Sequence, residues 1–364
     1  MKKIVYLFLL LTCCVELTSC RKNKDDEISI SDGKIILETE VIDAEYSKKT
    51  DILIYASSKP HQLHVYSTRK NTRKTIDLDF APLSVAIALD GKTAVVGHDA
   101  RISYIDLVSM RVTKVYDVSC EVFDIVLSPN NWVYAFPKRD QAVKVHCIEL
   151  ATGVETLNPF QLIRERSKAK IHPSGKYLYV ADNGVSPSDI VKFDIQYGTA
   201  QYMYDSPYHG TYNIDGDLWF SEDGNRIFVK GRTVLKSSEV KTQDMVYNGT
   251  VPHDTVFTNY YMHRSIIGLD HSQATNALYV INKGTNWDDP GLPFVYIHNA
   301  LNLDYIKKIP LETYAATDNY GYSVVKGVEP LFVFVNAKGN RLFVITKSAK
   351  IPNKNEWAIQ IINN

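Results

Sequence analysis

The sequence has few cysteines and lacks the short motifs of common catalytic sites. Only five of its 364 residues are cysteine, and after residue 20 only Cys120 and Cys147 occur. A fold that depends on several disulfides is therefore excluded, and whether these two residues form a bridge is left open. The sequence has none of the motifs Gly-x-Ser-x-Gly, His-Glu-x-x-His and Cys-x-x-Cys, and it has no Gly-rich phosphate loop. The sequence therefore contains no motif from which an enzyme class could be assigned.

The sequence also lacks long helical periodicity, an excess of either charge and a convincing metal motif. The 41 basic residues are balanced by 41 acidic ones, so no nucleic-acid partner is indicated. Asn213, Asp215 and Asp217 have the spacing that begins a calcium loop, but Leu218 stands where a glycine is required and Gly224 where a glutamate is required. We expect neither a metal nor another cofactor.

The first twenty residues have the pattern of a secretion signal. Lys2 and Lys3 precede the apolar run 4–15, which is shorter than the roughly 20 residues that span a bilayer. Residues 17–20, Leu-Thr-Ser-Cys, fit a lipobox, which predicts cleavage before Cys20 and attachment of lipid chains, palmitate among them, to that residue. The alternative is a generic signal peptide in which Cys20 is incidental.

Residues 20–33 are predicted to form a flexible tether after the 1–19 signal peptide. Their charged start, RKNKDDE, contains a Lys-Asp-Asp step at residues 24–26. This step resembles the acidic export signal of Bacteroidetes-type surface lipoproteins, which implies an outer-membrane protein exposed at the cell surface. The alternative is a solvated polar linker with no such role.

A repeat organises the remaining residues, 34–364. Each copy has a β-rich run, a turn and a second apolar run, as in IHPSGKYLYVAD (residues 171–182) and FSEDGNRIFVKG (residues 220–231). The turn positions recur at intervals of 41, 40, 44, 49, 51 and 64 residues, at Thr50, Gly91, Asn131, Gly175, Gly224, Thr275 and Gly339. Copies of this length match four-stranded propeller blades.

The fold class is therefore predicted to be all-β, a single closed β-propeller of seven blades. The last copy is one strand short, and the N-terminal run 34–41 can supply its outer strand. An unclosed ring would expose strand edges that promote aggregation.

The turn and strand style of HPSGKYLYVAD resembles the YVTN or lactonase-like propeller superfamily, which is related to WD-repeat-like and quinoprotein-like propellers. The Gly-His and Trp-Asp pairing of true WD repeats is not found. The resemblance implies a propeller fold and is a poor guide to activity, although it includes lactonases.

Candidate ligand residues lie on the loops that propellers place at their binding face. Residues 283–293, KGTNWDDPGLP, offer a tryptophan for stacking on a sugar ring or a planar ligand. The alternative is a tryptophan that folds back over its own blade. The candidates are His98, Asp99, Lys138, Arg139, Asp182, Asn183, Tyr208, His209, Arg232, His253, Trp287, Asp288, Tyr320 and Tyr322.

These features predict a surface lipoprotein that captures a ligand on one propeller face, for nutrient uptake. The expected partner is a glycan, a small molecule such as a corrinoid, or an envelope or host protein, and the membrane is contacted through the lipid anchor alone. The chain is expected to be a monomer or part of an outer-membrane complex. Two alternatives stay open, a propeller enzyme (lactonase, polysaccharide lyase or hydrolase) and a scaffold for an envelope complex. No catalytic residue is assigned.

Overall fold

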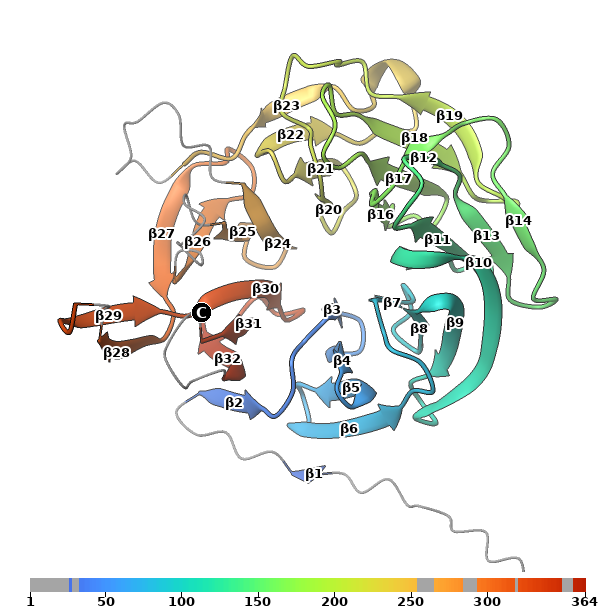
Figure 1. Cartoon of the computed structure of the whole chain (residues 1–364). Coiled ribbons are helices and arrows are strands. Elements are labelled where there is room, and N and C mark those ends of the chain that lie inside the picture. The colour runs from blue at the N-terminus through green and yellow to red at the C-terminus, as the bar shows by residue number, and fades with distance from the viewer. Residues whose placement is uncertain (1–25, 28–32, 254–264, 284–292, 318–319, 349–355) are drawn as a thin grey trace, which may run out of the picture.

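The computed structural model describes residues 26–27, 33–253, 265–283, 293–317, 320–348 and 356–364. This part of the chain is built from strands, with one short 3-10 helix, η1 (Lys241–Gln243). Its sheets are arranged around a common centre, as Figure 1 shows. None of its helices has the length and apolarity needed to cross a membrane. The predicted signal peptide and Cys20 lie outside the described residues.

Five sheets of four or five strands form separate blades. In each of them, neighbouring strands are antiparallel. The first has the strand order β1 (Asp26–Glu27), β6 (Thr72–Asp77), β5 (His61–Ser67), β4 (Ile52–Ser58) and β3 (Asp43–Ser47). The next two follow chain order: β16 (Lys168–Ile171), β17 (Tyr177–Ala181), β18 (Ile190–Asp194) and β19 (Gln201–Asp205), and then β20 (Leu218–Phe220), β21 (Arg226–Val229), β22 (Thr233–Lys236) and β23 (Tyr247–Thr250). The last two are β24 (Ile266–Ser272), β25 (Ala277–Asn282), β26 (Phe294–Asn299) and β27 (Tyr305–Pro310), and the sheet with the order β2 (Lys34–Leu37), β32 (Trp357–Asn363), β31 (Arg341–Lys347) and β30 (Glu329–Val335).

A sixth large sheet contains seven strands. Its order is β14 (Glu155–Leu157), β13 (His146–Glu149), β11 (Trp132–Pro137), β10 (Arg111–Leu127), β9 (Asp99–Asp106), β8 (Thr93–Gly97) and β7 (Ser84–Ile87). β10 has 17 residues, of which the segment 111–121 pairs with β9 and the segment 122–127 with β11. Five separate blades are thus found where seven were predicted, because β10 runs without interruption through two repeats and joins their sheets.

The N-terminal run is a strand, as the repeat required. β2 pairs antiparallel with β32, with Ile35 opposite Ile359 and Leu37 opposite Trp357. Ile35 and Leu37 alternate with the more exposed residues of β2 and are buried, in the period-two pattern of a strand with one covered face. Within the predicted tether, β1 pairs with the outer strand β6.

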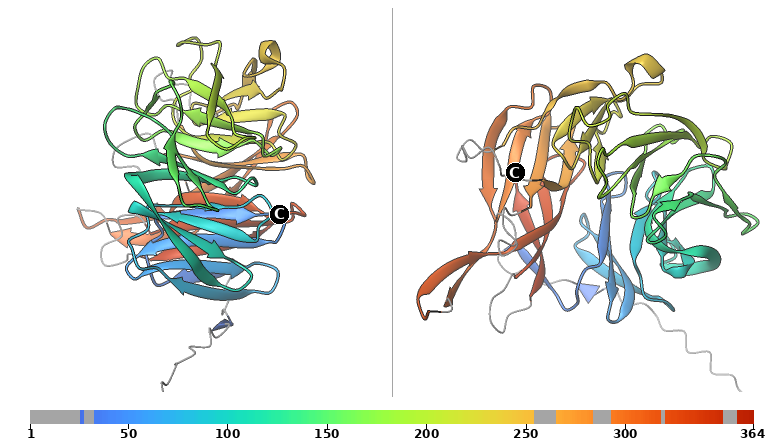
Figure 2. Two further views of the ribbon diagram at one scale, coloured as in Figure 1. Left: turned by 90° about the vertical axis from the view of Figure 1, so that its right-hand side faces the viewer. Right: turned by 45° about the horizontal axis from the view of Figure 1, so that its top comes forward.

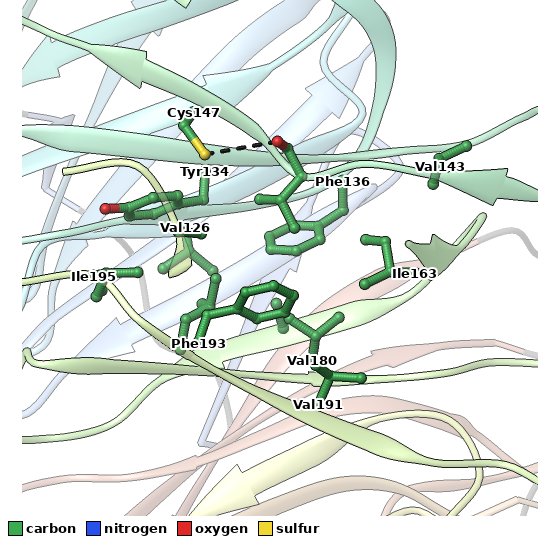
Figure 3. Close-up of a cluster of buried hydrophobic side chains, with 14 residues drawn as sticks. Val126, Tyr134, Phe136, Val143, Cys147, Ile163, Val180, Val191, Phe193 and Ile195 are labelled. Atoms are coloured by element: carbon green, nitrogen blue, oxygen red, sulfur yellow. Dashed lines mark hydrogen bonds between the residues drawn. The ribbon is translucent and has the colours of Figure 1, made fainter. Parts of the chain in front are cut away.

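The hydrophobic cores lie between neighbouring sheets. Figure 3 shows one of them, where Phe136 of β11 faces Phe193 of β18 among aliphatic side chains from both sheets. Cys147 belongs to this core, and its thiol contacts the carbonyl oxygen of Val145 at 3.6 Å. Cys120 lies within β10, and both cysteines are free thiols. Sheet-to-sheet packing of this kind leaves the inner edge of each sheet facing the centre.

Two small ribbons stand apart from the large sheets. β12 (Ala142–Val143) pairs with β15 (Ile163–Arg164), and β28 (Thr313–Thr317) pairs with β29 (Ser323–Gly327). The turned views in Figure 2 show the β28–β29 hairpin projecting from the body. The repeat did not predict these ribbons, because β28 and β29 lie between two repeats and β12 is an insertion between two strands of one repeat, β11 and β13.

Candidate functional site

The inner strands enclose a cavity of about 660 Å³ at the centre of the propeller. Charged and aromatic side chains line it together with aliphatic ones. The charged lining residues are Asp43, Glu45, Lys48, Asp124, Lys138, Lys168, Lys170, Asp217 and Asp270, and the aromatic ones are Tyr46, Phe123, Trp219, Phe332 and Phe334. The volume falls within the range of small-molecule sites, roughly 300 to 1,000 Å³. We refer to this cavity as the central channel.

Seven of the nine charged lining residues occupy one of two equivalent positions in the repeats. Four of them lie seven positions before the turn residue of their own copy: Asp43, Asp124, Lys168 and Asp217. A second level lies five positions before the turn: Glu45, Lys170, Trp219, Asp270 and Phe334. Because alternate side chains of a strand point to the same side, each inner strand presents both of its positions to the channel.

Ion pairs in the channel connect the inner strands of neighbouring repeats and of distant ones. Lys168 Nζ lies 3.0 Å from Asp124 Oδ1, and Lys170 Nζ lies 2.6 Å from Glu45 Oε1. Burial alone would lower the pKa of each lysine, but the surrounding carboxylates outweigh it and raise both pKa values. Both lysines are therefore ammonium ions at neutral pH.

Lys48 forms a further bridge at the second level. Its Nζ lies 2.8 Å from Asp270 Oδ1 and 2.6 Å from Glu222 Oε1. Burial raises the pKa of Asp270, and the nearby ammonium of Lys48 opposes this effect. One lysine is thus shared by two carboxylates.

Several of the channel carboxylates also join one inner strand to the next. Asp43 Oδ2 accepts a hydrogen bond from the backbone N–H of Val85 at 2.8 Å, and Asp124 Oδ2 accepts one from Ala169 at 2.8 Å. Asp270 Oδ2 accepts from the N–H of Val335 at 2.8 Å. Hydrogen bonds to a charged acceptor are stronger than neutral ones, so these aspartates hold neighbouring sheets together around the channel.

Asp43 has the most clearly altered acidity in the channel. Burial raises its pKa to about 6, and neighbouring Asp124 and Glu45 act in the same direction. Lys168 and the Val85 N–H oppose this shift. The folded protein therefore binds a proton at Asp43 more tightly than the unfolded chain, whose aspartates have pKa values near 3.9.

This difference predicts a pH dependence of stability. The folded state keeps the Asp43 proton up to about pH 6, whereas the unfolded chain releases it near pH 4, so stability due to this group is lost as the pH rises through that interval. The free energy of unfolding of the wild type, relative to Asp43→Asn, should fall between about pH 4 and pH 7. Urea unfolding of both proteins across this range tests it, and a constant difference would contradict it.

Two of the loop residues predicted as ligand contacts are buried within the fold. His98 Nε2 lies 2.9 Å from Ser103 Oγ, and its Nδ1 lies 3.0 Å from the carbonyl oxygen of Ala81. Burial lowers the pKa of His98, so its ring is neutral at pH 7. Arg232 donates to the carbonyl of Val251 and to Asn282 Oδ1, each at 2.8 Å. These side chains stabilise loops, and neither lines the channel.

Other predicted residues lie at the surface or near it, and only Lys138 among them reaches the channel lining. Lys138 pairs with Glu121, and Arg139 Nη2 lies 2.6 Å from Glu121 Oε2. His209 Nδ1 lies 3.2 Å from Asp189 Oδ2. Asp99 is exposed, and the remaining candidates are half-buried: Asp182, Asn183, Tyr208 and His253. The hydroxyl oxygen of Tyr208 accepts a hydrogen bond from the N–H of Tyr247 at 2.9 Å.

The aromatic candidates do not come together at one site in the described part of the chain. Tyr320 and Tyr322 are 86% and 70% exposed in the β28–β29 hairpin, away from the channel. Trp287 and Asp288, which carried the stacking hypothesis, lie outside the described residues, so that hypothesis is still a prediction. Trp219 of β20 is one of the aromatic residues that do line the cavity.

The cluster of Ser119, His146 and Glu155 contains the residue types of a catalytic triad but not its geometry. Ser119 Oγ and Glu155 Oε1 both contact Nδ1 of His146, at 3.4 and 2.5 Å. A nucleophile activated by histidine needs the serine on one ring nitrogen and the acid on the other. Within the described ranges, no group of three or more His, Cys, Asp or Glu side chains is arranged to hold a metal ion.

The channel residues were not among the candidates predicted from the sequence, because those candidates lie on loops. The detectable signal was charge inside apolar inner strands, in the runs IDAEYS, VFDIVL, KAKI and GDLWF, at a constant distance from the turn of each copy. Such charges would be costly if buried alone, so their recurrence indicates a shared polar axis.

The fold and the channel place this protein in the class of β-propellers. It is similar to the crystal structure of the Cps50 (Swd1) β-propeller domain of Myceliophteria thermophila, with a TM-score of 0.61 and 10% identity over 91% of this chain and 99% of that one. It is also similar to the hydrazine synthase of Kuenenia stuttgartiensis, with a TM-score of 0.62 and 14% identity over 92% and 99% of the two chains. No protein-family model and no curated protein matches the sequence. These likenesses establish the fold alone.

Proposed function

We propose that this protein is a lipid-anchored surface protein that binds a ligand in the central channel, for nutrient capture and without catalysis. The observation that carries the proposal is the channel itself, with a volume of about 660 Å³ and a lining of charged and aromatic side chains. A channel filled with apolar side chains would instead have favoured a scaffold. Preformed concave sites with a few polar groups are the usual form of small-molecule sites.

The ring that contains this site is, in our proposal, closed and seven-bladed. The long strand β10 is counted once in each of two blades, which divides the seven-stranded sheet at that strand. Inner strands of seven repeats contribute to the lining of the channel: β3, β7, β10, β16, β20, β24 and β30. A hydrophobic cluster that joins Ile35 and Phe343 of the last sheet to Tyr55 of the first supports closure.

The anchoring part of the proposal rests on the sequence. The lipobox at residues 17–20 supplies the lipidated residue, and the charged residues that follow would hold the propeller away from the membrane. Outer-membrane localisation and exposure at the cell surface follow from the resemblance of residues 24–26 to an export signal. A glycan, a small molecule or an envelope protein is the ligand class that such a position offers.

Isothermal titration calorimetry against a panel of sugars, organic cations, organic anions and corrinoids tests the binding function. Replacing Trp219, which lines the channel, by alanine should weaken binding of the active compound by about tenfold, since a buried aromatic contact contributes roughly 1 to 3 kcal/mol. The matched control is Tyr197→Ala, because Tyr197 is 92% exposed outside the channel. Absence of binding by every compound, or equal loss in both variants, would contradict a site in the channel.

The same panel separates the alternatives. An enzyme would turn over a lactone or polysaccharide during the titration, and this would appear as continuing heat and a new product. A scaffold would bind none of the small molecules and would co-purify with an envelope protein from solubilised outer membranes.

A further inference from the structure

The central channel contains more carboxylates than its lysines neutralise. Its lining has five carboxylates and four lysines. Lys138 pairs with Glu121, and Lys48 is shared with Glu222, and both of these glutamates lie outside the lining. The lysines therefore leave a net negative charge inside the channel, and the residues that carry it can be named.

Asp43 and Asp217 are the channel carboxylates without an ion pair among the described residues. Asp43 accepts the backbone N–H groups of Ala44 and Val85, and Asp217 Oδ1 accepts the N–H of Leu218 at 2.8 Å. Burial raises the pKa of Asp217, and Lys168 and Lys170 oppose this shift without forming an ion pair with it. Both side chains are half-buried in the lining. A carboxylate held there without a cation loses part of its hydration, and a bound cation would offset that loss.

The surroundings of Asp217 differ from those of the other inner aspartates. Asp43 and Asp124 each bridge to a backbone N–H on the inner strand that follows, whereas the hydrogen bond of Asp217 goes to its own neighbour, Leu218. On the following inner strand, the position level with Asp217 is Gly268, which lines the channel without a side chain. The carboxylate of Asp217 is thus left available to a ligand in the channel.

Aromatic side chains lie at the same part of the channel. Trp219 of β20 is two residues after Asp217, which directly precedes the strand, and both residues line the channel. Phe123 already accepts a cation over its ring, since Lys168 Nζ lies 4.9 Å from the ring centroid. Faces of aromatic rings attract organic cations, and the attraction is greater where water is excluded.

We propose that the channel ligand is a small organic cation, an ammonium compound whose charge is paired with Asp217 and whose apolar part contacts Trp219. This inference rests on the proposed ligand-binding function and narrows the ligand class. A neutral sugar would leave Asp43 and Asp217 without a counter-charge, and an anion would be repelled by them. Asp43 adds negative charge at the same level of the channel.

The experiment compares cations with neutral molecules of the same shape. Choline and phenethylamine are titrated into the purified full-length protein beside 3,3-dimethylbutan-1-ol and 2-phenylethanol, which match their shapes without the charge, and beside maltose. At least one cation is expected to bind at least about tenfold more tightly than its neutral counterpart, as for a hydrogen bond to a charged group.

Asp217→Asn should remove this preference, because the amide has nearly the same shape without the charge. The matched control is Asp215→Asn, since Asp215 lies two residues away, outside the channel, where it accepts the N–H of Gly184 at 3.1 Å. The melting temperature of each variant verifies that it is folded. Equal binding of charged and neutral partners, or a cation preference that survives in Asp217→Asn, overturns the cation proposal.

Failure of this inference is distinguishable from failure of the proposed function. Binding of maltose alone, weakened by Trp219→Ala, would overturn the cation while leaving a ligand-binding channel. Binding of no compound in either panel would count against both.

Discussion

Replacing Lys192 by methionine is expected to lower the free energy of unfolding by about 3 to 5 kcal/mol, as for other buried ion pairs that lose one partner. Lys192 Nζ lies 2.9 Å from Asp244 Oδ2, and the two side chains are 1% and 0% exposed. Methionine would leave the Asp244 carboxylate buried without its cation. Equilibrium unfolding in urea measures the change.

The network around this pair explains why so large an effect is expected. Asp244 accepts hydrogen bonds from the hydroxyl groups of Tyr179 and Tyr204 and from the N–H of Ser238 at 2.7 Å. The ammonium of Lys192 also lies 4.2 Å from the centroid of the Tyr177 ring. The pair thereby fixes the loop between β22 and β23 against the preceding blade, so its loss should loosen that junction.

Lys176→Met is the matched control for this prediction. Lys176 lies one residue before β17 and pairs with Glu239 at 2.8 Å, but the two side chains are 44% and 61% exposed. Solvent screens such a pair, so its removal should change stability little. Adding Asp244→Asn to Lys192→Met should recover part of the lost stability, because no unpaired charge is then buried. Equal effects of Lys192→Met and Lys176→Met would contradict the prediction.

Deleting residues 34–41 is expected to destabilise the entire propeller and to cause aggregation. The deletion removes β2 from its pairing with β32 and takes Ile35 and Leu37 out of the core. Burial of two such side chains contributes at least about 3 kcal/mol, and the uncovered edge of β32 could pair with other molecules. The deletion also removes Lys34. Its Nζ lies 2.8 Å from Glu312 Oε1 and 3.0 Å from Glu356 Oε1. Thermal unfolding and size-exclusion chromatography measure the outcome.

Cys20→Ala is the control that separates anchoring from folding. It should abolish lipid attachment, release the protein from the membrane fraction and leave the melting temperature unchanged. A variant without residues 34–41 that melts like the wild type would show that β2 is dispensable. A Cys20→Ala protein that fails to fold would contradict the separation of tether and propeller.

The strands were largely predictable because their signal is local. Alternating apolar residues between turn formers identified the runs 171–182 and 220–231, and these contain β17 and β21 of the structure. The missing strand of the last repeat was also found, in β2. The continuity of β10 was not predictable, because the residues between two repeats retain strand character and only pairing on both sides decides whether a strand breaks there.

The candidate site was predicted less well than the fold. His98 and Arg232 were selected for their loop positions, but packing turned their side chains into the fold. Asp124 and Lys170 were passed over as ordinary strand residues, and they face the channel. Sequence separation hides such partners, since Lys170 and Glu45 are 125 residues apart and still form an ion pair.

The sequence by itself determined that this chain forms a repeated all-β structure, because strand periodicity and turn chemistry act over a few neighbouring residues. It also placed charges at constant positions within the inner strands. Only the tertiary structure decided that these charges meet around one channel, which of them pair, and that Asp43 and Asp217 are left without a cation. The physical reason is that ion pairing depends on distances across the ring, and these are set by the packing of all the sheets together.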